Sequence, residues 1–387
     1  MRVLFSSTAG AGHFGPLIPF AKACQAAGHE VLVAAPASFA SSVAAASLAH
    51  APFADVPPDV MGPVFARLPS LPREEANALV IGHIFGRLDA QAALAGVTAT
   101  VEEWRPDIVV REPTEFASWV AAEKAGVPQA VVAIGVAEMD EEAKPILVEP
   151  LAELRALAGL DDDRQLAGLA ALPYFSMVPP TFDGVGLRRS GAVRRFRTPI
   201  DGDRQGRLPA SWGDPDWPLV YVSFGSVTAT VPVFAPIYGA VVDVVAELPV
   251  RVLLTVGEGD GLAVDRVAAN VHVERWWPQA DVMPSAAAVV GHGGFGTTMT
   301  ALAGGVPQVV VPLFSMDQFL NARRVAEVGV GICVEGGIDG IGTLPDALSG
   351  ILGEPAFGES ARLMAKEMAS LPDVSQAVPI LEQLAAG

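Results

Sequence analysis

Short apolar runs alternate along the first half of the chain with longer stretches that are apolar on one side only. Short runs bounded by turn residues are typical of buried parallel strands, and the longer stretches are typical of helices packed on them. Gly28 follows the first such stretch, where a helix would end. The pattern predicts strands at 2–6, 31–35, 107–111 and 129–133 and helices at 16–27 and 115–125, with loops and short helices over 52–75.

The second half repeats the pattern after a segment rich in Gly, Pro and Asp. We expect an N-terminal domain at 1–200, a linker at 201–217 and a C-terminal domain at 218–370. A last helix at 371–387 would follow a break near Leu371-Pro372 and pack back on the N-terminal domain. The C-terminal domain should contain strands at 219–224, 250–256, 271–274, 288–291, 308–311 and 331–334 and helices at 297–304 and 318–328. The predicted fold class is α/β, with two Rossmann-like doubly wound domains facing each other across a cleft.

Composition narrows the class of partner. The 387 residues include 25 Lys and Arg against 43 Asp and Glu, a net charge of −18. Nucleic acids and anionic membrane surfaces are bound by excess positive charge, so neither is an expected partner. The chain has only two cysteines, Cys24 and Cys333, and we expect neither a signal peptide nor a membrane span. We expect a cytoplasmic protein that is a monomer or a homodimer.

The first glycine loop spells Gly10-x-Gly12-x-x-Gly15, the pattern of dinucleotide-binding domains. Such domains place an acidic residue at the end of the second strand, but here that strand ends Ala34-Ala35-Pro36, which disfavours NAD binding. His13 lies inside the loop, where it could act as a general base. Glu112 follows the strand at 107–111 and could support it. In the alternative interpretation, His13 caps a helix and Glu112 is a solvated loop charge.

The second glycine loop carries the most specific pattern in the sequence. His292, Gly293, Gly294, Gly296 and Thr297 stand between a predicted strand and a predicted helix. Their backbone amides and the helix dipole would favour an anion such as a diphosphate. The surrounding motifs, which also include Gln279, add an aromatic plane for a base at Trp276 and a carboxylate and an amide for a sugar at Asp317 and Gln318.

Taken together, these motifs resemble a GT-B nucleotide-sugar glycosyltransferase, a family that includes bacterial antibiotic and macrolide enzymes and plant UDP-glycosyltransferases (family 1). The resemblance implies an inverting, metal-independent transfer of a sugar to a hydroxyl of a hydrophobic natural product. It makes His13 the base and Glu112 its partner. The donor-binding residues that it implies are Gly12, Gly225, Ser226, Trp276, Gln279, His292, Gly293, Gly294, Gly296, Thr297, Asp317 and Gln318.

One departure from the plant pattern bears on the donor. The plant enzymes have a glutamate that holds both ribose hydroxyls at the position of Thr300. Its loss favours a deoxyribose donor, so a dTDP-sugar, often a deoxysugar, is expected over a UDP-sugar. No cofactor and no metal are expected. Three Asp-x-Asp sequences, which begin at Asp161, Asp201 and Asp214, are interpreted as turn residues.

The acceptor should bind to the N-terminal domain through apolar residues in its poorly periodic segments. The candidates are Phe53, Met61, Phe65, Phe85, Met139 and Ile146, with Ile84 and Trp119 also considered. Each could equally be a core residue. Two other functions stay open at this point: a sugar-nucleotide epimerase of similar fold, and a non-catalytic partner that activates a true transferase.

Overall fold

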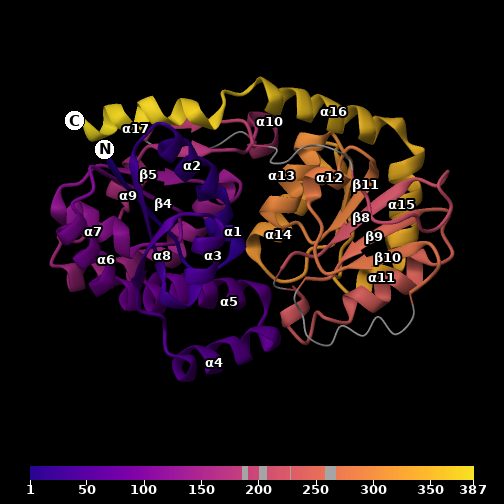
Figure 1. Ribbon diagram of the computed structural model, residues 1–387. Coiled ribbons are helices and arrows are strands. Elements are labelled where there is room, and N and C mark those ends of the chain that lie inside the picture. Colours follow the sequence, from indigo (N-terminus) through magenta and orange to yellow (C-terminus); the bar gives the residue numbers. More distant parts are fainter. Residues whose placement is uncertain (185–190, 200–206, 227, 258–266) are drawn as a thin grey trace. The chain divides into compact units, whose positions relative to one another are not determined.

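A computed structural model describes residues 1–184, 191–199, 207–226, 228–257 and 267–387 (Figure 1). The chain divides into two compact units. The first unit contains residues 1–177, 191–197 and 372–387, and the second contains 178–184 and the described part of 198–371. Each unit is built on a parallel sheet covered by helices on both faces. The predicted α/β class is therefore confirmed for each unit.

The sheet of the first unit has seven parallel strands in the order β3-β2-β1-β4-β5-β6-β7. Neighbouring residues of a strand face opposite layers of helices: Val3 and Phe5 pack with α2 (Ile18–Ala26), and Leu4 packs with α6 (Ala90–Trp104) and α7 (Ala117–Ala125). The strands are β1 Arg2–Ser6, β2 Glu30–Pro36, β3 Ala49–Phe53, β4 Ile108–Arg111, β5 Gln129–Val132, β6 Tyr174–Ser176 and β7 Val193–Arg195.

The remaining helices of the first unit are mostly short, apart from α8. One of them, η4 (Leu79–Asp89), is π-helical and runs directly into α6. The others are α1 Ala11–Phe14, η1 Gly15–Leu17, η2 Ala37–Phe39, α3 Ala40–Ala45, α4 Pro58–Arg67, η3 Leu68–Ser70, α5 Arg73–Ala78, α8 Ala137–Ala158, α9 Ala167–Ala171, η7 Val374–Gln376 and α17 Ala377–Ala385.

The sheet of the second unit has six parallel strands in the order β10-β9-β8-β11-β12-β13. They are β8 Leu219–Ser223, β9 Arg251–Thr255, β10 Val271–Glu274, β11 Ala286–Gly291, β12 Gln308–Val310 and β13 Gly331–Cys333. The helices are α10 Pro180–Asp183, η5 Thr228–Thr230, α11 Ile237–Val245, α12 Gln279–Val282, α13 Phe295–Gly304, α14 Met316–Glu327, η6 Asp339–Thr343, α15 Leu344–Gly353 and α16 Pro355–Ser370.

Two segments lie differently from the expected domain ranges. Residues 178–184 fall in the second unit rather than in a domain at 1–200, because Arg324 of α14 donates to the carbonyl oxygens of Thr181 and Phe182 at 2.8 Å. Residues 201–206 of the expected linker lie outside the described residues. The rest of that segment packs on the second sheet, where Trp212 is part of a hydrophobic cluster and donates to the Val252 carbonyl.

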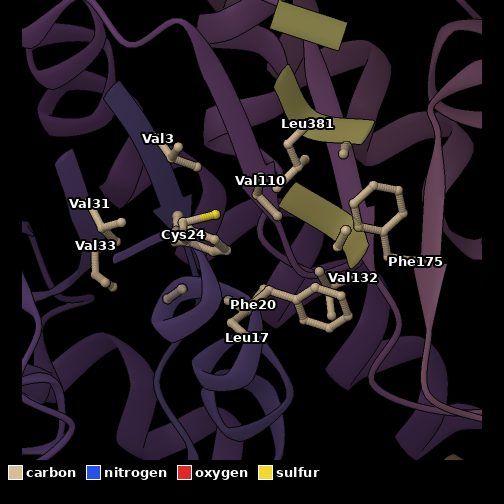
Figure 2. Close-up of a cluster of buried hydrophobic side chains, with 14 of the residues drawn as sticks. Val3, Leu17, Phe20, Cys24, Val31, Val33, Val110, Val132, Phe175 and Leu381 are labelled. Atoms are coloured by element: carbon tan, nitrogen blue, oxygen red, sulfur yellow. The ribbon is translucent and has the colours of Figure 1, made fainter. Parts of the chain in front are cut away.

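The end of the chain belongs to the core of the first unit. Val374 and Leu381 are buried in the same cluster as Phe20 and Phe175, and Figure 2 shows Leu381 near Val110 in this cluster. Arg197 holds this segment in place, because its amide donates a hydrogen bond to the Pro372 carbonyl and its guanidinium donates one to the Asp373 carboxylate. The C-terminal helix α17 thus covers one face of the first sheet together with α2.

Candidate active site

In both sheets the strand order reverses between two central neighbours, β1 and β4 in the first unit and β8 and β11 in the second. In open parallel sheets, ligands bind beyond the carboxyl ends of the strands at such a point. We call these two places the β1–β4 edge and the β8–β11 edge. The first carries His13 and Glu112, and the second carries Gly225 and the loop that begins at His292.

The β1–β4 edge brings His13 and Glu112 together. His13 lies in α1, in the loop after β1, and Glu112 directly follows β4. The distance from Nδ1 of His13 to Oε1 of Glu112 is 3.5 Å; the His13 side chain is 22% exposed and the Glu112 side chain is fully buried. The ring of Phe85, from η4, contacts the His13 ring with centroids 5.1 Å apart. Glu112 is thus a buried partner of His13 rather than a solvated loop charge.

The carboxylate of Glu112 is held by several donors. Thr8 donates to Oε1 through its amide at 3.2 Å and its hydroxyl at 2.9 Å, and Thr114 donates to Oε2 through its amide at 2.6 Å. The Thr114 hydroxyl lies 2.9 Å from both carboxylate oxygens and 3.0 Å from Nδ1 of His13. The sequence analysis did not single out Thr114, although its position two residues after Glu112 suits a turn that returns to that side chain.

These contacts set the charge of Glu112. Burial by itself raises the pKa of Glu112, but the charge of His13 and the hydrogen bonds from Thr114 and Thr8 outweigh it and lower the pKa to about 2. Glu112 is therefore an anion throughout the physiological range. A fixed anion beside an imidazole stabilises the imidazolium that forms when the ring accepts a proton.

Asp89, at the end of η4, is a third ionisable group near this edge. Burial raises the pKa of Asp89 to about 6; the charge of His13 opposes the shift and that of Glu112 adds to it. Asp89 lies four residues after Phe85, which in a π-helical segment places the two on nearly the same side. Perturbed carboxyl groups of this kind gather at functional sites.

The predicted acceptor residues do not form one group. Phe53 is 6% exposed and packs in the core against α6, and Ile84 and Trp119 are also core residues. Phe85 contacts His13. Phe65 is 53% exposed on α4, where Met61 is partly buried, and Met139 lies at the start of α8.

A pocket of about 470 Å³ lies beside η4 in the first unit. Of the predicted acceptor residues, only Ile146 lines it. Its wall combines apolar and charged side chains: Arg67, Leu71, Glu75, Ala78, Leu79, Gly82, His83, Arg87 and Ile146.

The β8–β11 edge is built around the ring of His292. A Cβ atom at Gly225 would lie 2.7 Å from this ring, and one at Gly294 would lie 2.6 Å from it, so glycine is required on both sides. Burial lowers the pKa of His292 to about 4, and the backbone of Ser223 opposes this only in part. His292 is therefore neutral at physiological pH, in contrast to the charge-supporting surroundings of His13.

The loop after His292 leads directly into a helix. Gly294 precedes the first turn of α13, and Gly296 is exposed with open space where a Cβ would lie. The Thr297 hydroxyl accepts a hydrogen bond from Nε2 of Gln279 at 3.0 Å, which connects two of the predicted donor residues. Trp276 is 73% exposed and Ser226 is exposed, so both are accessible to a ligand.

The next loop is held by the side chains of α14. Gln318 is buried, and its Oε1 accepts from the amides of Leu313 and Phe314, while Asp317 accepts from the Ser315 hydroxyl at 2.6 Å. Asn321 is fully buried and donates to the Gly293 carbonyl at 2.7 Å. The sequence analysis missed Asn321, although it lies one helical turn after Asp317 on the same helix.

The Asp-x-Asp sequences have local roles where they are described. Asp163 accepts from the amides of Ala167 and Gly168, and Asp214 accepts from the amide of Asp216. The sequence at 201–203 lies outside the described residues. Within the described ranges, no group of three or more His, Cys, Asp or Glu side chains is arranged to hold a metal ion. In the same part of the chain, no helix combines the length and the apolar character needed to cross a bilayer.

Comparison with known proteins gives the class to which this fold and these sites belong. The fold matches the GT-B glycosyltransferase SsfS6 of Streptomyces sp. SF2575, solved as a complex with thymidine diphosphate, with a TM-score of 0.76, 28% identity and 99% coverage of both chains. The chain is a glycosyltransferase.

Its family follows from the sequence. Residues 22–149 match the N-terminal domain, and 239–384 the C-terminal domain, of the family described as erythromycin biosynthesis protein CIII-like. The L-demethylnoviosyl transferase of Streptomyces niveus is 32% identical over 96% of this chain and 95% of its own. The elloramycin glycosyltransferase ElmGT of Streptomyces olivaceus is 33% identical over 96% and 94%. The chain belongs to this family of antibiotic glycosyltransferases, which confirms the resemblance.

Proposed function

We propose that the protein transfers a sugar from a dTDP-sugar to a hydroxyl group of a hydrophobic natural product, with inversion at the anomeric carbon and without a metal ion. The observation that carries the proposal is the buried pair of His13 and Glu112 at the β1–β4 edge. The second unit would bind the donor, and the first unit would bind the acceptor and supply the base.

In this reaction His13 removes the proton of the acceptor hydroxyl as its oxygen attacks C1 of the sugar. The bond between C1 and the diphosphate oxygen breaks, and its electron pair leaves with the diphosphate. Glu112 stays ionised and stabilises the imidazolium. The departing charge is stabilised by the amides at the start of α13, by the dipole of that helix and by the neutral His292 ring.

Two observations support a dTDP donor. Thr300 uses its hydroxyl within its own helix, since Oγ1 donates to the Gly296 carbonyl at 2.8 Å, and it provides no carboxylate for a ribose 2′-hydroxyl. The related SsfS6 was solved with thymidine diphosphate. We therefore expect thymidine diphosphate to bind more tightly than uridine diphosphate.

Calorimetry with both nucleotides, followed by mass spectrometry of a panel of sugar donors and aglycones, tests the proposal. The expected result is tighter TDP binding and a glycoside product that forms at an undiminished rate in excess chelator. Tighter UDP binding would overturn the choice of donor, and strong inhibition by chelator would overturn the metal-free mechanism. Retention of configuration in the product, determined by NMR, would overturn inversion.

A further inference from the structure

The direct contact between His13 and Glu112 is longer than a good hydrogen bond. Nitrogen-to-oxygen distances in such bonds are about 2.7–3.2 Å, whereas Nδ1 of His13 lies 3.5 Å from Oε1 of Glu112. The Thr114 hydroxyl has shorter distances to both, 3.0 Å to Nδ1 and 2.9 Å to each carboxylate oxygen. Hydrogen bonds through the Thr114 hydroxyl therefore connect His13 and Glu112 at shorter distances than their direct contact does.

Counting protons on this connection fixes the direction of each hydrogen bond. An ionised carboxylate can only accept, and a hydroxyl has one proton to donate. The Thr114 hydroxyl proton must then point to Glu112. The Thr114 oxygen therefore accepts a hydrogen bond from Nδ1 of His13. The proton between Thr114 and His13 therefore belongs to Nδ1 of the ring.

We propose that Thr114 is a positioning residue whose hydroxyl links Glu112 to His13 and holds the ring in the tautomer that carries its proton on Nδ1. The proposal rests on the proposed role of His13 as the base. With Nδ1 protonated, Nε2 holds the lone pair that takes the acceptor proton. The Nδ1 proton and the Thr114 proton stay in place during this step, and Glu112 remains ionised.

The loop that carries Thr114 is anchored in a way that suits this role. Arg111 is 1% exposed, and its Nη1 donates to the carbonyl oxygens of Glu112 and Glu115 at 2.9 Å and of Pro113 at 3.2 Å. A buried cation thus fixes the backbone on both sides of Thr114. The Phe85 ring, whose centroid lies 5.1 Å from that of the His13 ring, also restricts the orientation of His13.

Thr8 offers a matched comparison within the same network. Its hydroxyl donates to Oε1 of Glu112 at 2.9 Å, the same distance as that of Thr114, whereas the hydroxyl at 3.0 Å from Nδ1 of His13 is that of Thr114. Thr8→Val and Thr114→Val each remove one hydroxyl from the carboxylate, and only the second removes the link to the ring. Thr100→Val, which removes a hydroxyl bonded to the Gly96 carbonyl in α6, serves as a control away from the site.

Turnover of these variants gives the first test. Thr114→Val should lower kcat about 10- to 100-fold, because a hydrogen bond to a charged network and the selection of the tautomer are both lost. Thr114→Ser should stay close to the wild type, Thr8→Val should lose less than Thr114→Val, and Thr100→Val should be unaffected. TDP affinity should be the same in all four. Equal kcat values for Thr114→Val and the wild type, or a failure of serine to restore activity, would overturn the proposal.

A second test does not depend on activity. The ¹⁵N shifts of the histidine side chains in the ligand-free enzyme at pH 8, with the His13 signals assigned from His13→Asn, report which ring nitrogen is protonated. The wild type should show a protonated Nδ1 and a bare Nε2, and Thr114→Val a mixture of the two tautomers. The opposite tautomer in the wild type would overturn the proposal. The expected tautomer in an enzyme that makes no glycoside would instead contradict the proposed function.

Discussion

The β1–β4 edge and the β8–β11 edge occupy the same place in two similar sheets, and each has a glycine-containing loop and a histidine. Their electrostatics are opposite. At the first edge a buried carboxylate with a pKa of about 2 stands beside His13 and favours a charged ring. At the second edge burial lowers the pKa of His292 to about 4 and keeps that ring neutral. The difference shows that the topology provides the location, while the residues beside each histidine decide its chemistry.

The largest expected effect separates catalysis at the first edge from binding at the second. His13→Ala should lower kcat about 10²- to 10⁴-fold, the usual contribution of a positioned base. TDP affinity should stay within about twofold of the wild type, because all the predicted donor residues except Gly12 lie in the second unit. Rate measurements and calorimetry on the same preparation check both. Near-normal turnover would remove His13 from the role of base.

A glycine substitution tests the second edge in the same way. In Gly294→Ala the new methyl group would lie 2.6 Å from the His292 ring, so the ring or the loop must move. Such overpacking costs about 1–3 kcal/mol, and TDP affinity should fall about 10-fold or more. Gly239→Ala is the matched control, because it lies in α11 of the same unit, outside the predicted donor residues, with open space for a Cβ. Equal affinities for the two variants would contradict the required approach of ring and backbone.

The neutral state of His292 has a consequence for stability. Between its ordinary pKa of 6.5 and its folded pKa of about 4, the unfolded chain binds the proton and the folded chain does not. Stability therefore falls as the pH falls through this window. The wild type should lose about 3 kcal/mol more than His292→Asn between pH 7 and pH 4. Thermal unfolding at several pH values checks this, and parallel curves for the two proteins would count against a neutral His292.

Asp89 should give the smallest effect, with the opposite dependence on pH. Its folded pKa of about 6 lies above its ordinary value of 3.8, so the folded state holds the proton more tightly between these values. Stability falls as the pH rises through this window, and the full cost is present above about pH 6. Asp89→Asn should raise stability by about 1–2 kcal/mol at pH 8. The gain should vanish near pH 4; a gain that does not depend on pH would point to packing instead.

The sequence predicted most of the two sheets, because buried parallel strands are apolar along their whole length and end at clear turns. The strands around Ala49–Phe53, Tyr174–Ser176 and Val193–Arg195 escaped prediction. The last two have only three residues each, and the first contains His50 and Pro52. The π-helical segment η4 was also missed, since its spacing differs from the regular helical period.

The site was predictable where a residue type and its position after a strand were enough. His13 and Glu112 follow two adjacent strands, so strand order brings them together. Thr114 and Asn321 were missed because a threonine or an asparagine is common in loops and helices, and its role depends on where the side chain points. Phe53 was assigned to the acceptor site because an apolar side chain gives the same signal in a core and in a pocket.

The path of the chain through the two units limits how the protein can be divided. Val374 and Leu381 complete the core around Phe20 and Phe175. The first unit therefore needs the last segment of the chain, 372–387, as well as residues 1–177. A fragment that stops near residue 197 would expose the apolar surface that α17 covers. Hybrids that combine the first unit of one relative with the second unit of another should therefore take residues 372–387 from the same parent as residues 1–177. A hybrid made with a single crossover would pack the C-terminal helix of one parent on the first unit of the other parent, where the two apolar surfaces are not matched.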